Sequence, residues 1–197
     1  GKGVISCTPA DLDMVPASWD IDDGACVRID LGVLSAGDTL SFDVSADTNI
    51  DILLFSASSI SVYQNEQNYR LDSVWHSDSV FESFQGDGTW HWTAPDDRGD
   101  TRWYLVLDNM AHPQDQGEGA QAGSLATVVL DIEEVDSPVF GIVDTIVRLD
   151  SGSHSVIAGP LVLDEGTQVN IFVTTMQGAP DIFLVTGTQM EFYEQGT

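Results

Sequence analysis

One stretch of the chain, residues 37–63, recurs as residues 166–193, and this repeat limits the architectures that the chain can adopt. The aligned pairs are Gly37 with Gly166, Leu40 with Val169, Phe42 with Ile171 and, after one inserted residue, Asp51-Ile52-Leu53-Leu54 with Asp181-Ile182-Phe183-Leu184 and Tyr63 with Tyr193. Two copies of one pattern predict a protein that is built from related modules. Gly37 and Gly166 suit tight turns, where a positive φ costs glycine nothing.

The predicted elements within these modules are strands. Residues 40–46 alternate between apolar and polar side chains, which is typical of a half-buried strand. Residues 50–56 are nearly all apolar after Asp51, as in a central strand that is buried on both faces. Other strands are predicted at 27–34, 101–109 and 124–135, with short strands near 60–63 and within 86–95. Because no long stretch has helical spacing, the fold class is all-β, an antiparallel, jelly-roll-like β-sandwich.

The repeat also predicts the domain organisation. Residues 1–135 form one complete module, and residues 139–197 form a partial second copy with strands near 140–150, 154–163, 166–175 and 180–187. The second copy has no counterpart of 101–109 or 124–135, so it would expose an apolar face and an unpaired strand edge. Two explanations stay open. Either the natural chain continues past residue 197, or a neighbouring chain completes the second copy, which would allow self-association.

The charge balance limits the partners. The chain has 32 acidic residues against 6 Lys and Arg, which gives a formal net charge of −26. Such a charge repels phosphate backbones and anionic lipids, so nucleic acid is not an expected partner. No apolar run is long enough to insert into a membrane. The acidity favours either a solvated surface suited to salty water or the binding of divalent cations, and the two are compatible.

Loop carboxylates are the candidate ligands for calcium. Hard cations take six to eight oxygen ligands, and acidic side chains gather in two predicted loops. The candidates are Asp20, Asp22, Asp23, Asp96, Asp97 and Asp100. The alternative is that these residues only cap turns through local hydrogen bonds to the backbone. Asp51 and Asp181 each precede an apolar strand, where a local hydrogen bond is favoured over a metal ligand.

Two cysteines, Cys7 and Cys26, lie near the N-terminus. A disulfide between them would tie the N-terminal segment to the first strand and add about 3 kcal/mol of stability. The alternative is a pair of buried free thiols. The disulfide would indicate an oxidising, extracytoplasmic location, that is, an extracellular or cell-surface protein.

Aromatic side chains offer a candidate binding surface. The candidates are Trp90, Trp92, Trp75 and Tyr69. Trp90 and Trp92 would share one face of a strand, and a flat aromatic platform is suited to stacking against sugar rings. The alternative is core packing, because tryptophan is usually buried.

Catalysis is not expected. The four histidines lack the spacing of a zinc site, and no nucleotide-binding glycine pattern occurs. A hydrolase with a scattered Ser–His–Asp triad stays as the third hypothesis, because scattered residues carry no visible pattern.

Several segments of the first module resemble one family. They are DIDDG (20–24), AGDTLSFDV (36–44), IDILLF (50–55) and WYLVLDN (103–109). Together they resemble the bacterial and archaeal pre-peptidase C-terminal domain and the related emp24/GOLD-like β-sandwiches. The resemblance implies a secreted or cell-surface accessory module without catalytic activity. Some family members bind calcium near the N-terminal acidic segment, and some bind polymers such as collagen or glycans.

The leading hypothesis is therefore a non-catalytic extracellular or cell-surface accessory module. It would bind a surface polysaccharide or a protein, with Ca²⁺ as a structural ion. The alternative is a structural subunit of a surface assembly, whose incomplete C-terminal half is completed by a neighbouring chain.

Overall fold

The structure is a computed structural model, and it describes residues 4–69, 80–95, 99–114, 123–136, 149–158, 161–163, 167, 169, 171, 173 and 179–195. The chain divides into two compact units: unit 1 is Gly1–Gly141, and unit 2 is Ile142–Thr197. Trp75, Asp96 and Asp97 lie outside the described residues. Within the described residues, no helix is long and apolar enough to cross a membrane.

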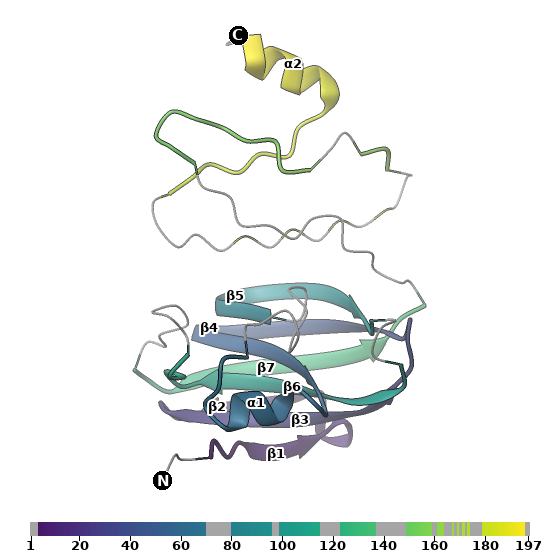
Figure 1. Ribbon diagram of the computed structural model, residues 1–197, viewed down its shortest axis with the longest axis vertical. Helices are drawn as coiled ribbons and strands as arrows, with labels where there is room; N and C mark the ends of the chain where they lie inside the picture. The colour runs from purple at the N-terminus through teal and green to yellow at the C-terminus, as the bar shows by residue number, and fades with distance from the viewer. Residues whose placement is uncertain are drawn as a thin grey trace. The chain divides into compact units, whose positions relative to one another are not determined.

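Unit 1 is built on one seven-stranded sheet, so the all-β fold class is confirmed (Figure 1). Its strands are β1 (Thr8–Asp11), β2 (Ala17–Ile21), β3 (Ala25–Leu34), β4 (Thr39–Ser56), β5 (Val80–Thr93), β6 (Thr101–Asn109) and β7 (Ala126–Glu134). The order is β1-β3-β6-β4-β7-β2, with β5 paired to β4 outside this path. Two short helices complete unit 1, the 3-10 helix η1 (Leu12–Met14) and the α-helix α1 (Ile60–Gln64).

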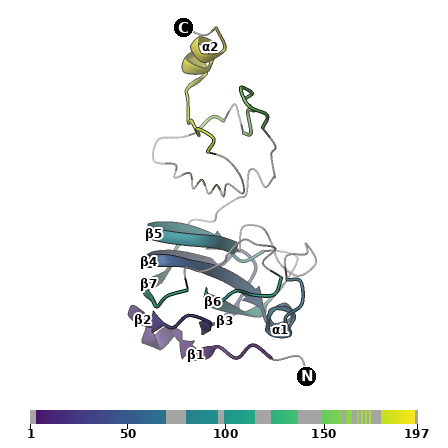
Figure 2. The ribbon, with the colours of Figure 1, turned by 90° about the vertical axis from the view of Figure 1, so that its left-hand side faces the viewer.

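Strand β4 organises the sheet. Its first half, Leu40–Ala46, pairs with β7, and its second half, Asp51–Ser56, pairs with β6. β5 runs antiparallel along both halves, with register shifts between Ala46 and Ile52, and lies beside β4 in both views (Figures 1 and 2). The two strands that the sequence predicts at 40–46 and 50–56 are therefore one long strand, which changes partner at its middle.

The main core lies on one face of this sheet. Alternate residues of β4, from Leu40 and Phe42 to Ile52 and Leu54, are buried in it. Strands β2, β3, β6 and β7 add further apolar side chains to the same cluster, which shows that the sheet curls around it. Burying each large apolar side chain contributes roughly 1.5–3 kcal/mol. The predicted alternation of 40–46 is confirmed, because Leu40, Phe42 and Val44 are all buried.

A second core lies on the opposite face of β4, β6 and β3. Leu53, Phe55 and Val106 lie there with Cys26, and α1 places Ile60 and Tyr63 over them. The predicted short strand at 60–63 is wrong. These residues form a helix because Ile60 and Tyr63, three positions apart, then point to the same apolar surface.

The turn before β4 has the predicted geometry. Gly37 has a φ of +92°, in the region that favours glycine. The N–H of Asp38 donates to the carbonyl oxygen of Ser35 at 3.0 Å, and the N–H of Ser35 donates to Asp38 Oδ2 at 2.7 Å. This turn sets the position at which β4 begins.

The described residues of unit 2 form one helix, α2 (Gly187–Gln195), and no strand. The predicted strands at 154–163 and 180–187 are thus not formed over their described parts. Residues 140–148 and most of 164–178 lie outside the described residues.

Candidate functional site

The N-terminal segment is fastened covalently to the sheet. The structure joins Cys7 and Cys26 in a disulfide, and Cys26 is buried within β3. The N–H of Ile5 also donates to the carbonyl oxygen of Gln64 at 2.8 Å, at the end of α1. The segment that contains Ile5 and Cys7 therefore contributes to the second core.

A group of buried polar side chains adjoins the second core at Tyr63. Asp51 of β4 and Asp108 of β6 are directly opposite each other in the sheet, and both are fully buried. The hydroxyl of Tyr63 donates to Asp108 Oδ2 at 2.8 Å, and the N–H of Met110 donates to Asp108 Oδ1 at 2.9 Å. The ring of His112 stacks on Tyr63, and its Nε2 is 3.0 Å from the Tyr63 carbonyl oxygen. These titratable groups are held in the interior, where they fix α1 to the sheet.

Two of the four predicted aromatic ligand residues lie in the interior. Tyr69 is fully buried, edge-on to Tyr63 and His112. Trp92 lies in the main core, 4.7 Å between ring centroids from Trp103. Neither ring presents a face to solvent. The prediction that Tyr69 and Trp92 stack against sugar rings is therefore wrong, because both are buried. Trp90 lies opposite Phe42 in the register of β5 and β4, and its side chain is outside the described residues, as is Trp75.

Those predicted calcium ligands that lie among the described residues are not close enough together to hold one metal ion. Asp20 accepts a hydrogen bond from the hydroxyl of Thr127 at 3.0 Å. The carbonyl oxygen of Asp22 accepts from the N–H of Ala25 at 3.0 Å, which closes a turn at Gly24. Asp23 and Asp100 are exposed. Across the part of the chain that the structure describes, no three His, Cys, Asp or Glu side chains are grouped to hold a metal ion.

A groove on the outer face of β4, β5 and β7 is the candidate binding site. It has a volume of about 420 Å³ and is lined by carboxylates and by apolar side chains. Asp43 of β4 lies opposite Asp131 of β7 on one side and Thr89 of β5 on the other, and the Thr89 hydroxyl bonds to Asp43. Val129, which is half exposed, and Pro16 supply apolar surface. The sequence shows Asp43 on a polar strand face, but only the cross-strand register places it beside Asp131.

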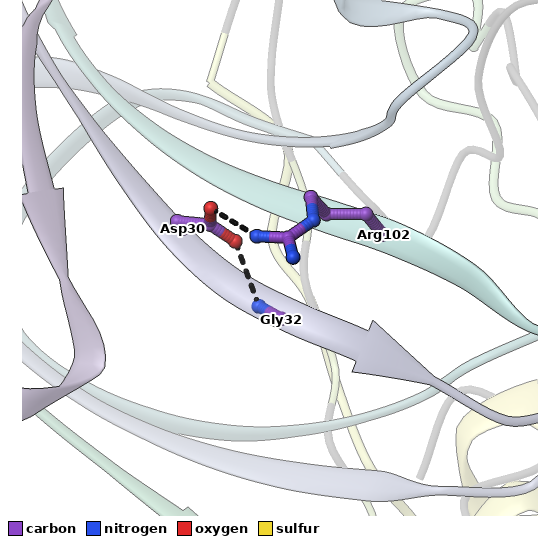
Figure 3. A network of polar contacts seen from close by, with 3 residues as sticks. All are labelled: Asp30, Gly32 and Arg102. Carbon is purple, nitrogen blue, oxygen red and sulfur yellow. Dashed lines mark hydrogen bonds and ion pairs between the residues drawn. The ribbon is translucent and has the colours of Figure 1, made fainter.

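Both arginines among the described residues lie elsewhere, on β3 and β6. The Asp30 carboxylate of β3 accepts from Arg102 Nη1 at 2.5 Å and from the N–H of Gly32 at 2.9 Å (Figure 3). The guanidinium of Arg28 lies 5.2 Å from the ring centroid of Tyr104. Neither of these arginines lines the groove. Among the described residues, the carboxylates of the groove therefore lie beside apolar surface and have no cationic side chain next to them.

The chain was compared with family models, with curated proteins and with solved structures. No family model and no curated protein matches the chain. Among solved structures, PliG of Aeromonas hydrophila, a periplasmic lysozyme inhibitor of g-type lysozyme, is similar at 11% identity and a TM-score of 0.38, over 65% of this chain and 98% of that one. A similarity at this level does not identify a function. The resemblance to the pre-peptidase C-terminal domain stays a prediction.

Proposed function

We propose that this protein is an extracytoplasmic, non-catalytic binding module that recognises a protein partner through the groove on β4, β5 and β7. The observation that carries the proposal is the combination of side chains in the groove. Asp43, Asp87 and Asp131 lie beside the exposed apolar surface of Val129 and Pro16. Apolar contact supplies affinity, and the carboxylates select a partner that presents lysine or arginine side chains.

The disulfide and the net charge support the same function. A disulfide such as Cys7–Cys26 persists in oxidising compartments, which favours an extracellular or cell-surface location. A net charge of −26 accelerates the approach of a cationic partner, and this acceleration weakens as salt is added. A polysaccharide with cationic groups would satisfy the same carboxylates, and it is the alternative ligand.

The test separates the groove from the overall charge. The protein is screened against an array of cationic secreted proteins and a glycan array, and binding to the strongest probe is then measured at physiological salt. The Asp43→Asn/Asp131→Asn variant is compared with Asp11→Asn/Asp13→Asn, which removes the same charge at exposed positions of β1 and η1. We expect roughly tenfold weaker binding for the groove variant and less than a twofold change for the control. Equal losses would show that only net charge matters, and the proposal would fail.

A second candidate is a structural subunit whose C-terminal half is completed by a neighbouring chain. The specific observation that favours it is the exposed apolar run of unit 2, where Ile182, Phe183 and Leu184 are 58%, 65% and 80% exposed. Exposed apolar surface of this kind marks interaction sites. The test is sedimentation of the protein mixed with the proteins of the cell surface from which it comes. A co-sedimenting complex is expected if this candidate is right, and a free chain if it is not.

A further inference from the structure

Two carboxylates of the groove are direct neighbours across strands. Asp43 of β4 and Asp131 of β7 are opposite each other in the register, so their side chains leave the same face of the sheet. Directly opposite side chains in an antiparallel pair have Cβ atoms about 4.5–5.5 Å apart, and like charges in this arrangement destabilise the pair. A cation that lies between Asp43 and Asp131 would remove this repulsion. The two carboxylates are therefore placed to share one positively charged group.

Hydrogen bonds orient both carboxylates and occupy one oxygen of each. The hydroxyl of Thr89 donates to Asp43 Oδ1, and the N–H of Ile132 donates to Asp131 Oδ1 at 2.9 Å. Neither Oδ2 atom accepts a hydrogen bond from a residue that the structure describes. Side chains that are oriented before binding lose less conformational freedom when a ligand arrives. Each carboxylate thus offers a ligand one oxygen from an ordered position.

A third carboxylate and an apolar side chain lie one step further along the strands. Ser45 of β4 is two residues from Asp43, which corresponds to about 6.8 Å along the strand. Asp87 of β5 is opposite Ser45 on one side, and Val129 of β7 is opposite it on the other. Alternate side chains of any extended chain repeat at the same interval. An extended segment in the groove can therefore present one side chain to each of these two rows.

A guanidinium group suits these surroundings better than an ammonium group. Its N–H donors lie in one plane in a fixed fork, so a single guanidinium can donate to two carboxylates at once. It is also more weakly hydrated than an ammonium, which lowers the cost of placing it against the apolar surface of Val129 and Pro16. The methylene groups of an arginine side chain add apolar contact to the same surface.

We propose that the groove binds an extended segment of a partner protein, and that this segment has arginine at alternate positions. This inference rests on the proposed function and names the residues that the partner presents. The first guanidinium lies between Asp43 and Asp131, against Val129. The second, two residues further along the segment, donates to Asp87.

The chain itself does not supply this segment. No two of its six Lys and Arg residues are two positions apart in the sequence. Unit 2 has one arginine, Arg148, and seven acidic residues, so the charge of unit 2 opposes its binding to an acidic groove. The seven are Asp144, Asp150, Asp164, Glu165, Asp181, Glu191 and Glu194. A second copy of the chain, with its formal charge of −26, is repelled in the same way.

The test compares fluorescent peptides of equal charge on the full chain at physiological salt. We expect Ser-Arg-Ser-Arg-Ser to bind at least about fivefold more tightly than Ser-Lys-Ser-Lys-Ser, because net charge attracts both peptides equally. Ser-Arg-Arg-Ser-Ser has its arginines on opposite sides of an extended chain and should bind roughly threefold more weakly than the alternating peptide.

Three variants assign the effect to the groove. Asp43→Asn/Asp131→Asn should weaken binding of the alternating arginine peptide about tenfold, and Asp11→Asn/Asp13→Asn less than about twofold. Val129→Ser changes a half-exposed side chain. It should reduce the preference for arginine over lysine to below about twofold, with little change in the affinity of the lysine peptide.

Several outcomes would overturn the inference: no binding of the alternating arginine peptide, equal binding of the arginine and lysine peptides, or equal binding of the alternate and adjacent arrangements. Tighter binding of a glucosamine oligomer would also overturn it, since the ligand would then be a cationic polysaccharide. The proposed function fails by a different result, equal losses of array-probe binding in the groove variant and the Asp11→Asn/Asp13→Asn control. The two failures are therefore distinguishable.

Discussion

Removal of the Cys7–Cys26 disulfide, by Cys7→Ser together with Cys26→Ala, tests how much this bond contributes to the stability of unit 1. The disulfide closes a loop with a sequence separation of 19 residues. In the loop-entropy model, opening such a loop lowers the free energy of unfolding by about 3 kcal/mol. Domains of this size have a total stability of roughly 5–15 kcal/mol, so the loss is a large share of it.

Little else in the described residues compensates for the lost bond. β1 pairs with β3 over four residues, and the N–H of Ile5 bonds to Gln64. Without the disulfide, we expect residues 4–11 to detach from the sheet before unit 1 unfolds. The transition temperature of a unit of this size then falls by about 10 °C.

The assay is urea unfolding followed by tryptophan fluorescence, with hydrogen exchange of residues 4–11 measured in parallel. A matched control is Cys7→Ser alone, which should lose the same stability because it opens the same bond. A loss below about 1 kcal/mol in the double variant, or unchanged exchange at 4–11, would refute the claim that the disulfide holds this segment.

Three further predictions concern unit 1. Tyr63→Phe removes the hydroxyl donor of the buried Asp108 and should cost about 1–3 kcal/mol in urea unfolding; a cost near zero would mean that this bond adds no net stability. Gly37→Ala places a β-carbon at a positive φ with no neighbouring atom within 4 Å, so the cost of about 1–2 kcal/mol is backbone strain alone, and a stabilised variant would contradict the observed turn. Trp92→Ala opens a cavity against Trp103 and should cost about 3–5 kcal/mol by thermal unfolding; loss of glycan binding without loss of stability would restore the surface role of Trp92.

Several strands of unit 1 could be predicted from the sequence, because their apolar residues alternate with polar ones or form short apolar runs. The strand predicted at 101–109 coincides with β6, and the alternation of 40–46 identifies which side chains of β4 enter the core. The helix at Ile60–Gln64 could not be predicted from local pattern. Its five residues are too few to show helical periodicity, and its position is fixed by the surface beneath Tyr63.

The candidate site is less accessible from the sequence. Asp43 and Asp131 are far apart along the chain and become neighbours only through the pairing of β4 with β7. Trp92 and Tyr69 were predicted as ligand residues but are buried. The sequence alone does not distinguish an aromatic side chain that packs in a core from one that binds a ligand. Composition alone could have shown that the protein is acidic, but not that acidic and apolar side chains meet in one groove.

The central claim is that a partner binds at the groove on β4, β5 and β7. Amide chemical shifts of the protein, recorded with and without the strongest probe of the array, test it directly. We expect the largest shift changes at residues that line the groove, among them Asp43, Thr89, Val129 and Asp131. Shift changes that cluster elsewhere on unit 1, with the groove residues unchanged, would contradict the claim.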